Sequence, residues 1–435
     1  MTNEDAQGLS SVPPASVGAP REGRPDHQRA IPLENYLEWA LDLGKKNRVQ
    51  ETETVPLADA LDRYLAEDVV SEVPVPTFTN AAMDGYAIRV EGELSAPLSL
   101  KIVGEQPAGP LRDITVKVGE ACRIMTGAPL PEGANTVVRS EYCGEDGHTV
   151  VLEQLEKLGA NVRTVGEDLS VGATVVSAGT FLGPRDVSAI ASVGQANVLV
   201  HKPLKVAIVS TGNELVAPGE PLAPGMIYES NSILLKGLLQ RAGFEAKVFA
   251  AVADTEEGLR SAMDEAGAWA NAALLSGGAS FGKYDVVRSL LGAGDTSRFV
   301  RVQMQPGKPQ GLGVWEGDGL KLPFMSFPGN PVSVFVSYQV FGLPFLLELL
   351  GTSNPPLTLY ASAGEDWKSP AGRTQFLPGR LVDAEPGKLP VIYPVSPLGS
   401  GSHLVTSLGQ ANVLAVGPKE ASRVLKGNQV EVRLF

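Results

Sequence analysis

The sequence predicts a multidomain α/β protein with one unit built on a parallel sheet, and three observations support this prediction. The chain has 435 residues, too many for one ordinary core when a domain commonly has about 150. From Lys205 onward, strand-like and helix-like segments alternate, which is typical of right-handed βαβ units. On both sides of that region, short β-prone pieces are separated by Pro and Gly. We therefore expect an α/β unit between two β-rich units.

The first ordered elements are predicted to be helices. Between residues 31 and 68, apolar residues fall at three- and four-residue intervals, which predicts two amphipathic helices. A further helix is predicted over residues 184–194, with Pro at its start and Gly at its end. We expect this helix to pack back on the first two, making a discontinuous domain.

The predicted domain plan follows from these segments. Residues 1–29 are rich in Pro, Gly, Ser and charge and lack the apolar core of a signal peptide, so we expect a disordered tail. The domains that we expect are a discontinuous helical linker domain (30–70 and 171–203), an inserted β-rich domain (71–170), an α/β domain (204–351) and a C-terminal β domain (352–435).

Charge and cysteine content exclude several classes of protein. The formal net charge of -13 argues against binding to nucleic acid or anionic lipid, which need a basic face. Two cysteines cannot form a disulfide framework or a four-ligand zinc site. Residues 330–350 are long and apolar enough to suggest a membrane span, but polar and Pro residues interrupt them. We expect a cytoplasmic protein with no membrane or nucleic-acid partner.

Three loops after predicted α/β strands carry acids: Glu214 in STGNEL, Asp254 in VADTEE and Asp285 in FGKYD. Neighbouring parallel strands would place these acids along one sheet edge, where carboxylates suit a magnesium ion that bridges to a phosphate. The backbone of Ser276, Gly277 and Gly278 could bind that phosphate. A solvated surface acid and an ordinary strand-to-helix turn are the alternatives. The absence of a GxxxxGK[ST] or GxGxxG motif disfavours ordinary ATPases and dinucleotide enzymes.

Two further phrases have both a structural and a functional interpretation. In PGNPVS, Asn330 and Pro331 are good N-cap and first-turn residues, so helix capping alone would explain them. The same helix start is compatible with an oxyanion bound by Ser333 and the nearby Lys308. In AAMDGYAIR, Asp84 and Gly85 would make a good turn between strands.

Nine phrases together resemble a known family. In chain order they are AAMDGYAIR, RIMTGAPLPEGAN, GEDLSVGA, STGNEL, IYESN, SGGASFGKYD, PGKP, FPGNPVS and GSHLVTSLGQAN. Their order and spacing are similar to those of the molybdopterin molybdenumtransferases, the molybdenum insertases related to the gephyrin E domain. The resemblance extends from about residue 30 to the C-terminus. It implies the same four-domain plan, an α/β domain of the molybdopterin-binding type, a C-terminal β-barrel-like domain and an elongated homodimer.

The resemblance also implies a reaction. Molybdate is inserted into the dithiolene of adenylylated molybdopterin, with Mg²⁺-dependent cleavage of the pyrophosphate linkage and release of AMP. Further partners implied are the molybdopterin adenylyltransferase and the molybdoenzyme apoproteins. The alternatives that we weigh are a molybdopterin adenylyltransferase, which shares the α/β domain, and a non-catalytic pterin-binding scaffold.

Site residues are carried over by motif. Glu214 and Asp285 would be the magnesium ligands, supported by Asp254. The inserted domain would contribute Asp84, Thr126 and Asp168 across the dimer interface. The substrate would contact Asn231, Ser276, Gly277, Gly278, Lys308, Ser333, Arg373 and Ser402, with the pterin or nucleotide phosphates at residues 276–278. The candidates for binding molybdate are Lys308, Ser333, Arg373 and Ser402. Gln305 departs from the family pattern, which often has a lysine there. Arg301, on the same strand face, would compensate.

Overall fold

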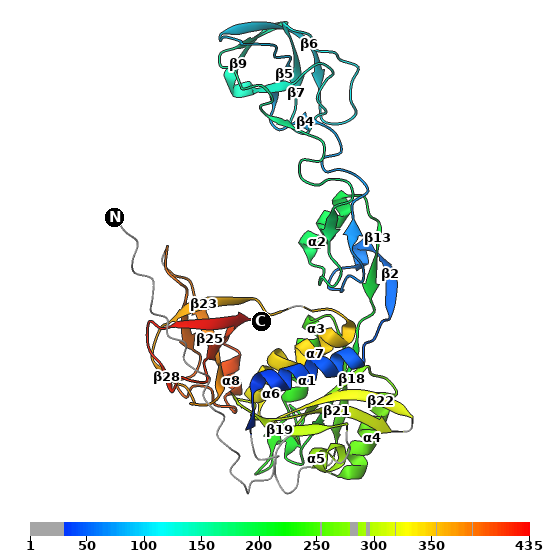
Figure 1. Ribbon diagram of the computed structural model, residues 1–435, viewed down its shortest axis with the longest axis vertical. Coiled ribbons are helices and arrows are strands. Elements are labelled where there is room, and N and C mark those ends of the chain that lie inside the picture. The colour runs from blue at the N-terminus through cyan, green and yellow to red at the C-terminus, as the bar shows by residue number, and fades with distance from the viewer. Residues whose placement is uncertain are drawn as a thin grey trace, which may run out of the picture.

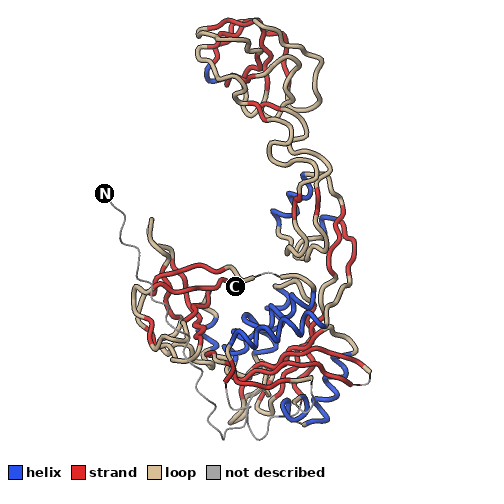
Figure 2. Tube along the Cα trace, in the orientation of Figure 1, coloured by secondary structure: helices blue, strands red, loops and turns tan. Residues whose placement is uncertain are grey.

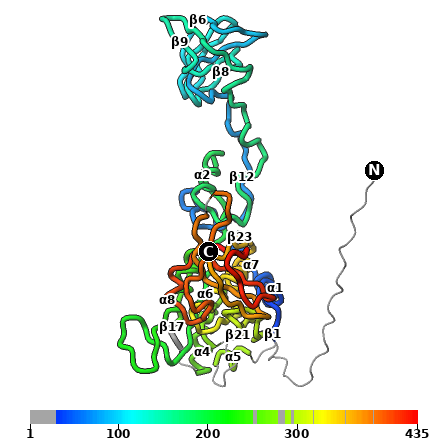
Figure 3. Tube along the Cα trace, turned by 90° about the vertical axis from the view of Figure 1, so that its left-hand side faces the viewer, coloured from blue at the N-terminus to red at the C-terminus, as the bar shows by residue number. Residues whose placement is uncertain are grey.

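The computed structural model describes residues 30–252, 255–278, 286–292, 296–317, 319–353, 355–384 and 386–435. Figures 1 and 3, which view the molecule at right angles, both show an elongated chain with a β-rich lobe at one end. A small middle unit joins this lobe to an α/β unit, and a second β unit lies beside the α/β unit (Figure 1). The multidomain α/β class predicted from the sequence is confirmed.

The α/β unit is built on a seven-stranded sheet with the order β1-β19-β21-β22-β18-β14-β17. These strands are β1 (Ala30–Ile31), β14 (Lys205–Thr211), β17 (Glu245–Val252), β18 (Ala272–Ser276), β19 (Arg298–Val302), β21 (Pro309–Gly317) and β22 (Leu320–Phe327). The four strands β22, β18, β14 and β17 are parallel, as predicted. β21 is antiparallel to both of its neighbours, so the complete sheet is mixed.

Helices cover both faces of this sheet because its central strands are apolar on both sides. In β14, Val206 and Ile208 face one core, whereas Ala207 and Val209 face the other. The first core contains α1 (Leu33–Lys46), α3 (Asn231–Arg241), α6 (Pro331–Ser337) and α7 (Leu343–Leu350). The second contains α4 (Glu256–Gly267) and α5 (Val286–Leu291). This double burial is typical of parallel strands.

The most apolar segment of the chain is a core helix. A π-helical turn (Tyr338–Gly342) joins α6 to α7, so residues Pro331–Leu350 form one helix. Among the described residues it alone is long and apolar enough to cross a membrane, but 78% of its most apolar window is buried. It packs against α1, and the C-terminal Phe435 contacts Phe335 edge-on at 4.8 Å.

The middle unit corrects the prediction of a helical linker domain. The predicted second helix is absent: β2 (Thr52–Pro56) pairs with β13 (Asn197–His201), and only a 3₁₀ turn (Leu57–Asp59) follows. β3 (Val69–Val70) pairs with β12 (Thr174–Val176), and α2 (Pro184–Ser192) is the one helix here among the described residues. The periodic leucines Leu57 and Leu65 are buried all the same, in a cluster with Ile190 and Val200. Strand pairing overrode a local helical spacing.

The first helix also lies in a different place from the one predicted. α1 packs on α7, and β1 pairs with β19 at the edge of the main sheet, so both belong with the α/β unit. Tyr36 is fully buried and donates its hydroxyl to the Gly311 carbonyl oxygen at 2.8 Å. The apolar face of α1 therefore covers the sheet and not the middle unit. The exact domain boundaries stay predictions.

The β-rich lobe at the top of Figure 1, here called the upper lobe, is almost entirely strand and loop (Figure 2). Its six-stranded sheet has the order β8-β5-β7-β6-β10-β9. The strands are β5 (Gly85–Ile88), β6 (Leu98–Gln106), β7 (Glu120–Ile124), β8 (Thr136–Arg139), β9 (Cys143–Asp146) and β10 (Thr149–Leu152), with a 3₁₀ turn (Ser140–Tyr142) after β8. A short pair, β4 (Asn80–Ala81) and β11 (Val162–Arg163), lies where the lobe meets the middle unit (Figure 1). Two apolar clusters form its core.

The C-terminal unit is a closed five-strand barrel, which confirms the predicted barrel-like domain. The strands β25-β26-β23-β29-β27 pair in that order, and β27 also pairs with β25, which closes the ring. They are β23 (Thr358–Ala363), β25 (Thr374–Val382), β26 (Val391–Pro394), β27 (Val413–Gly417) and β29 (Gln429–Leu434). β24 (Trp367–Lys368), β28 (Arg423–Val424) and α8 (Val405–Leu408) complete the unit. β20 (Met304–Gln305) pairs with β25 and joins the barrel to the α/β unit.

Candidate active site

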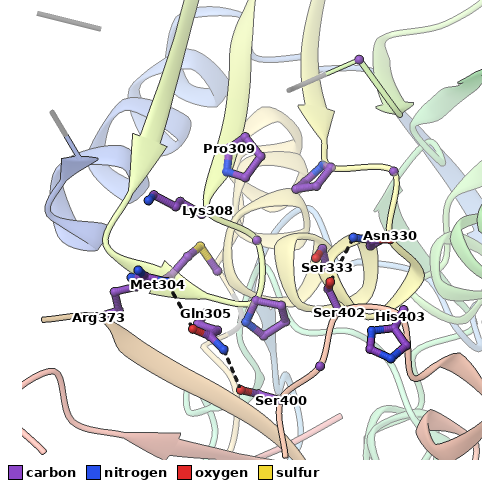
Figure 4. A pocket seen from close by; sticks show the side chains of 16 residues that line it. Met304, Gln305, Lys308, Pro309, Asn330, Ser333, Arg373, Ser400, Ser402 and His403 are labelled. Atoms are coloured by element: carbon purple, nitrogen blue, oxygen red, sulfur yellow. Dashed lines mark hydrogen bonds between the residues drawn. The ribbon is translucent and has the colours of Figure 1, made fainter. Parts of the chain in front are cut away.

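One pocket brings together four of the residues predicted to bind molybdate. It has a volume of about 480 Å³ and lies between the α/β unit and the barrel. The α/β unit contributes Lys308, from the turn between β20 and β21, and Ser333, from the first turn of α6. The barrel contributes Arg373, just before β25, and Ser402, from the loop before α8 (Figure 4). Two cations and two hydroxyls therefore line the same cavity.

Hydrogen bonds across this seam hold the two walls together. The Asn330 amide donates to the Ser402 hydroxyl at 2.9 Å (Figure 4). The Val332 N–H donates to the Ser402 carbonyl oxygen at 3.1 Å. Asn330 occupies the N-cap position of α6, but its side chain makes no capping hydrogen bond. Asn330 and Pro331 occupy the N-cap and first positions of α6, as the capping interpretation predicts, but the Asn330 side chain bonds across to the barrel instead of to the helix backbone.

Among the described residues that line it, the pocket carries the cations Lys308 and Arg373 and no carboxylate. Burial lowers the pKa of the Lys308 ammonium, and the nearby Arg373 and Arg301 guanidinium groups lower it further. Arg301 is not among the residues that line the pocket, yet it is close enough to act on Lys308 electrostatically. Cations are gathered in this way where an anion is to be bound, because the anion relieves their mutual repulsion.

Gln305 occupies the boundary between the two units. Its carboxamide oxygen accepts a hydrogen bond from Arg373 Nη1 at 3.3 Å, and its nitrogen donates to the Ser400 hydroxyl at 3.5 Å (Figure 4). Alternating burial along residues 301–305 confirms the expected side-chain alternation, with Arg301 and Gln305 on the less buried face. Gln305 thus holds a pocket cation, which the sequence did not predict.

The glycine turn after β18 lies beside this pocket. Gly277 and Gly278 have φ values of +97° and +72°, and a Cβ on Gly277 would lie 2.7 Å from the Thr211 carbonyl oxygen. Glycine is therefore required at 277 by both conformation and space. Gly278 lines the pocket, so the turn is open to a ligand at that residue.

Asn231 holds this turn against a neighbouring loop. Its side chain is buried, and its amide nitrogen donates to Ser276 Oγ at 2.8 Å and to the Gly329 carbonyl oxygen at 2.7 Å. Ser276 is buried as well. Both residues were predicted to contact substrate; in this structure they bond to each other, and Asn231 also holds the backbone at Gly329.

The predicted metal site is described only in part. Register places Ser210 beside Ser276 and Thr211 beside Val252, so the loops with Glu214, Asp254 and Asp285 follow adjacent strands. Asp254 and Asp285 themselves lie outside the described residues. Glu214 is exposed, and across the described part of the chain no three His, Cys, Asp or Glu side chains gather as a metal site. Of the three predicted acids the structure thus describes only Glu214, whose exposed carboxylate is the oxygen donor that it would offer to Mg²⁺.

Two of the three predicted residues of the inserted domain, Asp84 and Thr126, bond to each other. Asp84 Oδ1 accepts hydrogen bonds from the Thr126 N–H at 2.6 Å and the Thr126 hydroxyl at 2.8 Å, which lower the pKa of the Asp84 carboxyl. Asp84 lies in the bend between β4 and β5, as predicted, although these two strands do not pair with each other. Glycine is needed at 85 because a Cβ there would lie 1.9 Å from the Val138 carbonyl oxygen. Asp168 is exposed.

Asp84 and Thr126 do not approach the pocket within one chain. The strands that carry them, β4, β5 and β7, lie in the upper lobe, whereas α6 and α8 lie at the opposite end of the molecule (Figure 1). The middle unit separates the two ends in both perpendicular views (Figures 1 and 3).

Sequence reasoning missed some residues of the pocket wall. His403, Ser400 and Gly329 line the pocket but were not selected as site residues. Their signal was present in GSHLVTSLGQAN and FPGNPVS, two of the phrases that carry the resemblance. Only the folded chain shows that these two phrases face each other.

Comparison with known families gives the same domain order. Residues 31–194 match the MoeA N-terminal region (domain I and II), residues 207–348 match a probable molybdopterin binding domain, and residues 360–435 match the MoeA C-terminal region (domain IV).

Individual relatives match over most of the chain. Molybdopterin molybdenumtransferase 2 of Mycobacterium tuberculosis (strain H37Rv) is 36% identical over 394 residues, covering 87% of this chain and 94% of the relative. The Haemophilus influenzae molybdopterin molybdenumtransferase is 34% identical, with coverages of 88% and 94%. The crystal structure of the molybdopterin biosynthesis moeA protein from Pyrococcus horikoshii OT3 superposes with a TM-score of 0.76 at 28% identity, covering 94% of this chain and all of that one. This chain belongs to the MoeA family of molybdopterin molybdenumtransferases.

Proposed function

We propose that this protein inserts molybdate into adenylylated molybdopterin in molybdenum cofactor biosynthesis, with release of AMP and dependence on Mg²⁺. The observation that carries the proposal is the pocket in which Lys308, Arg373, Ser333 and Ser402 line one cavity beside Gly278. Family membership supports the transferase activity.

The pocket suits a small tetrahedral dianion. Lys308 and Arg373 would neutralise its charge, while the Ser333 and Ser402 hydroxyls would donate hydrogen bonds. Gly278 places bare backbone at the edge of the same cavity, where an N–H can approach a phosphate closely. The pocket residues could thus bind an oxyanion through Lys308 and Arg373 and a substrate phosphate through the Gly278 backbone beside them.

Magnesium belongs to the proposal through the acids at the ends of adjacent strands. Glu214 follows β14, and Asp254 and Asp285 follow the two strands that pair with it. Its test is direct: activity should be lost on chelation with EDTA and return with Mg²⁺. Activity that survives exhaustive chelation would remove the metal from the proposal.

We also propose that the working form is a homodimer in which Asp84 and Thr126 of one subunit complete the pocket of the other. This is supported by the separation of the upper lobe from the pocket within one chain (Figure 1). Asp168, also predicted from the inserted domain, would face the substrate in the same way. A cytoplasmic location, exchange with the molybdopterin adenylyltransferase and delivery to molybdoenzyme apoproteins complete the proposal.

The reaction is tested with the full-length protein, adenylylated molybdopterin and Mg²⁺, with and without molybdate. AMP release coupled to molybdenum-loaded cofactor is the expected result. Net adenylylation of molybdopterin from ATP would instead support the adenylyltransferase, and pterin binding without turnover would support a scaffold.

Subunit mixing tests the shared site. Asp84→Ala and Lys308→Met should each be inactive alone. Mixed after dissociation and reassociation, they should recover about a quarter of wild-type activity, because half of the random dimers would carry one intact site of two. No recovery, with mixed dimers shown to form, would place Asp84 and Lys308 in the same subunit's site or in none.

A further inference from the structure

Gln305 is the point at which the cationic pocket meets the hydrogen-bond network of the barrel. On one side its carboxamide oxygen accepts from Arg373 Nη1 at 3.3 Å. On the other its nitrogen donates to Ser400 Oγ, which also accepts from Gln375 Nε2 at 3.0 Å. Gln375 and Ser400 are both buried, and Gln375 in turn accepts from the Trp367 indole N–H at 3.2 Å. Arg373 is thus connected through Gln305 to a buried part of the barrel (Figure 4).

A carboxamide is suited to orient a guanidinium group without neutralising it. An arginine side chain loses considerable rotamer entropy when it is held in one place, so an aimed arginine needs a partner. A carboxylate partner would cancel its charge, and a lysine has no acceptor and would repel it. Glutamine supplies a neutral acceptor for Arg373 and a donor for Ser400 at the same time.

We propose that Gln305 is a positioning residue that aims Arg373 at an oxyanion bound beside Lys308 and leaves the positive charge of the pocket uncompensated. This inference rests on the proposed function, in which the pocket binds molybdate, and it names a residue that sets how tightly the dianion is held.

The charge balance around Lys308 supports this role. Burial lowers the pKa of Lys308, and Arg373 and Arg301 lower it further, so the pocket already works against the protonation of its lysine. A further cation at 305 would add to that repulsion. A neutral residue that organises the existing charges avoids this cost.

The test measures molybdate binding to the full-length protein by calorimetry, with sulfate as a competing dianion. Q305M keeps the length of the side chain but removes both hydrogen bonds, and it should bind molybdate about three- to tenfold more weakly. In turnover assays its KM for molybdate should rise by the same factor, with no change in KM for adenylylated molybdopterin. Q303M is the matched control, because Gln303 belongs to the same segment but donates to the Ala30 carbonyl oxygen and does not line the pocket. It should bind as the wild type does.

Q305K separates positioning from charge. If Gln305 acts as proposed, Q305K should lose molybdate binding at a lower pH than the wild type, since a new cation lowers the pKa of Lys308 again. Binding that is tighter than wild type across the pH range would overturn the inference, as would unchanged binding in Q305M. If the wild type itself binds no molybdate, the inference falls together with the oxyanion pocket of the proposed function. If the wild type binds molybdate and Q305M binds it equally well, only the role of Gln305 is overturned and the oxyanion pocket stands.

Discussion

Replacing Asn231 should destabilise the α/β unit and loosen the edge of the pocket. The Asn231 amide joins Ser276 Oγ and the Gly329 carbonyl oxygen at 2.8 and 2.7 Å, and its side chain is buried. Each hydrogen bond contributes about 1 kcal/mol net, and the buried Ser276 hydroxyl left without its donor costs a further 1–3 kcal/mol or so. Asn231→Leu should therefore lower the free energy of unfolding by about 2–4 kcal/mol.

Urea denaturation followed by tryptophan fluorescence measures this loss. Three of the four tryptophans, Trp39, Trp269 and Trp315, pack in the two cores of the α/β unit, so the signal reports the unit that contains Asn231. Ser276→Ala is the matched control, since it removes one of the two partners and should cost about 1 kcal/mol.

A second substitution gives the prediction a pH signature. Asn231→Asp keeps the shape of the side chain but turns an acceptor toward the Gly329 carbonyl oxygen. Its destabilisation should shrink as the pH falls, because a protonated carboxyl regains one donor. An Asn231→Leu protein within about 0.5 kcal/mol of wild type would refute the reasoning, since it would show that the amide does not join the two loops.

Three further outcomes are expected. Because the pKa of Lys308 is lowered, a rise in pH should weaken molybdate binding to the wild type before it reaches the range where lysines usually lose their proton. Lys308→Met should bind molybdate weakly at every pH tested. A pH profile of binding that this substitution leaves unchanged would contradict the assignment. Because the Thr126 hydrogen bonds lower the pKa of Asp84, an NMR titration should show that its carboxyl stays ionised to a lower pH than that of an ordinary aspartate. Thr126→Val should raise the pKa of Asp84. An unchanged pKa in that variant would show that Thr126 does not stabilise the ionised carboxylate. Glu214 is exposed, so Glu214→Gln should leave the melting temperature unchanged while the Mg²⁺ concentration for half-maximal activity rises; an unaltered Mg²⁺ dependence would remove Glu214 from the metal site.

The architecture was predicted well where local pattern and burial agree. The alternation of strands and helices after Lys205 reflects strands that are apolar on both faces, and β14 with its two cores bears this out. Helix α2 was predicted by its initial Pro and final Gly, and it begins at Pro184 as expected.

The failures share one physical cause. The leucines at 57, 61 and 65 have helical spacing, but the segment folds around a β2–β13 ladder whose strands lie far apart in the sequence. α1 is a helix as predicted, yet the surface that it covers is the α/β sheet. Periodicity predicted the burial of Leu57 and Leu65 but not the exposure of Leu61, because the packing of distant segments chooses which side chains are covered and by what.

By itself, the sequence determined the order of the units, the glycine turn at residues 276–278, the family, and the residue types that could hold an oxyanion. The tertiary structure alone decided that Lys308 and Ser333 from one unit meet Arg373 and Ser402 from another. It also decided that Asn231 bonds to Ser276, that Gln305 accepts a hydrogen bond from Arg373, and that Asp84 lies in a different lobe. The reason is that a side chain's chemistry is local, whereas its neighbours are set by long-range pairings such as β20 with β25, which local pattern does not encode.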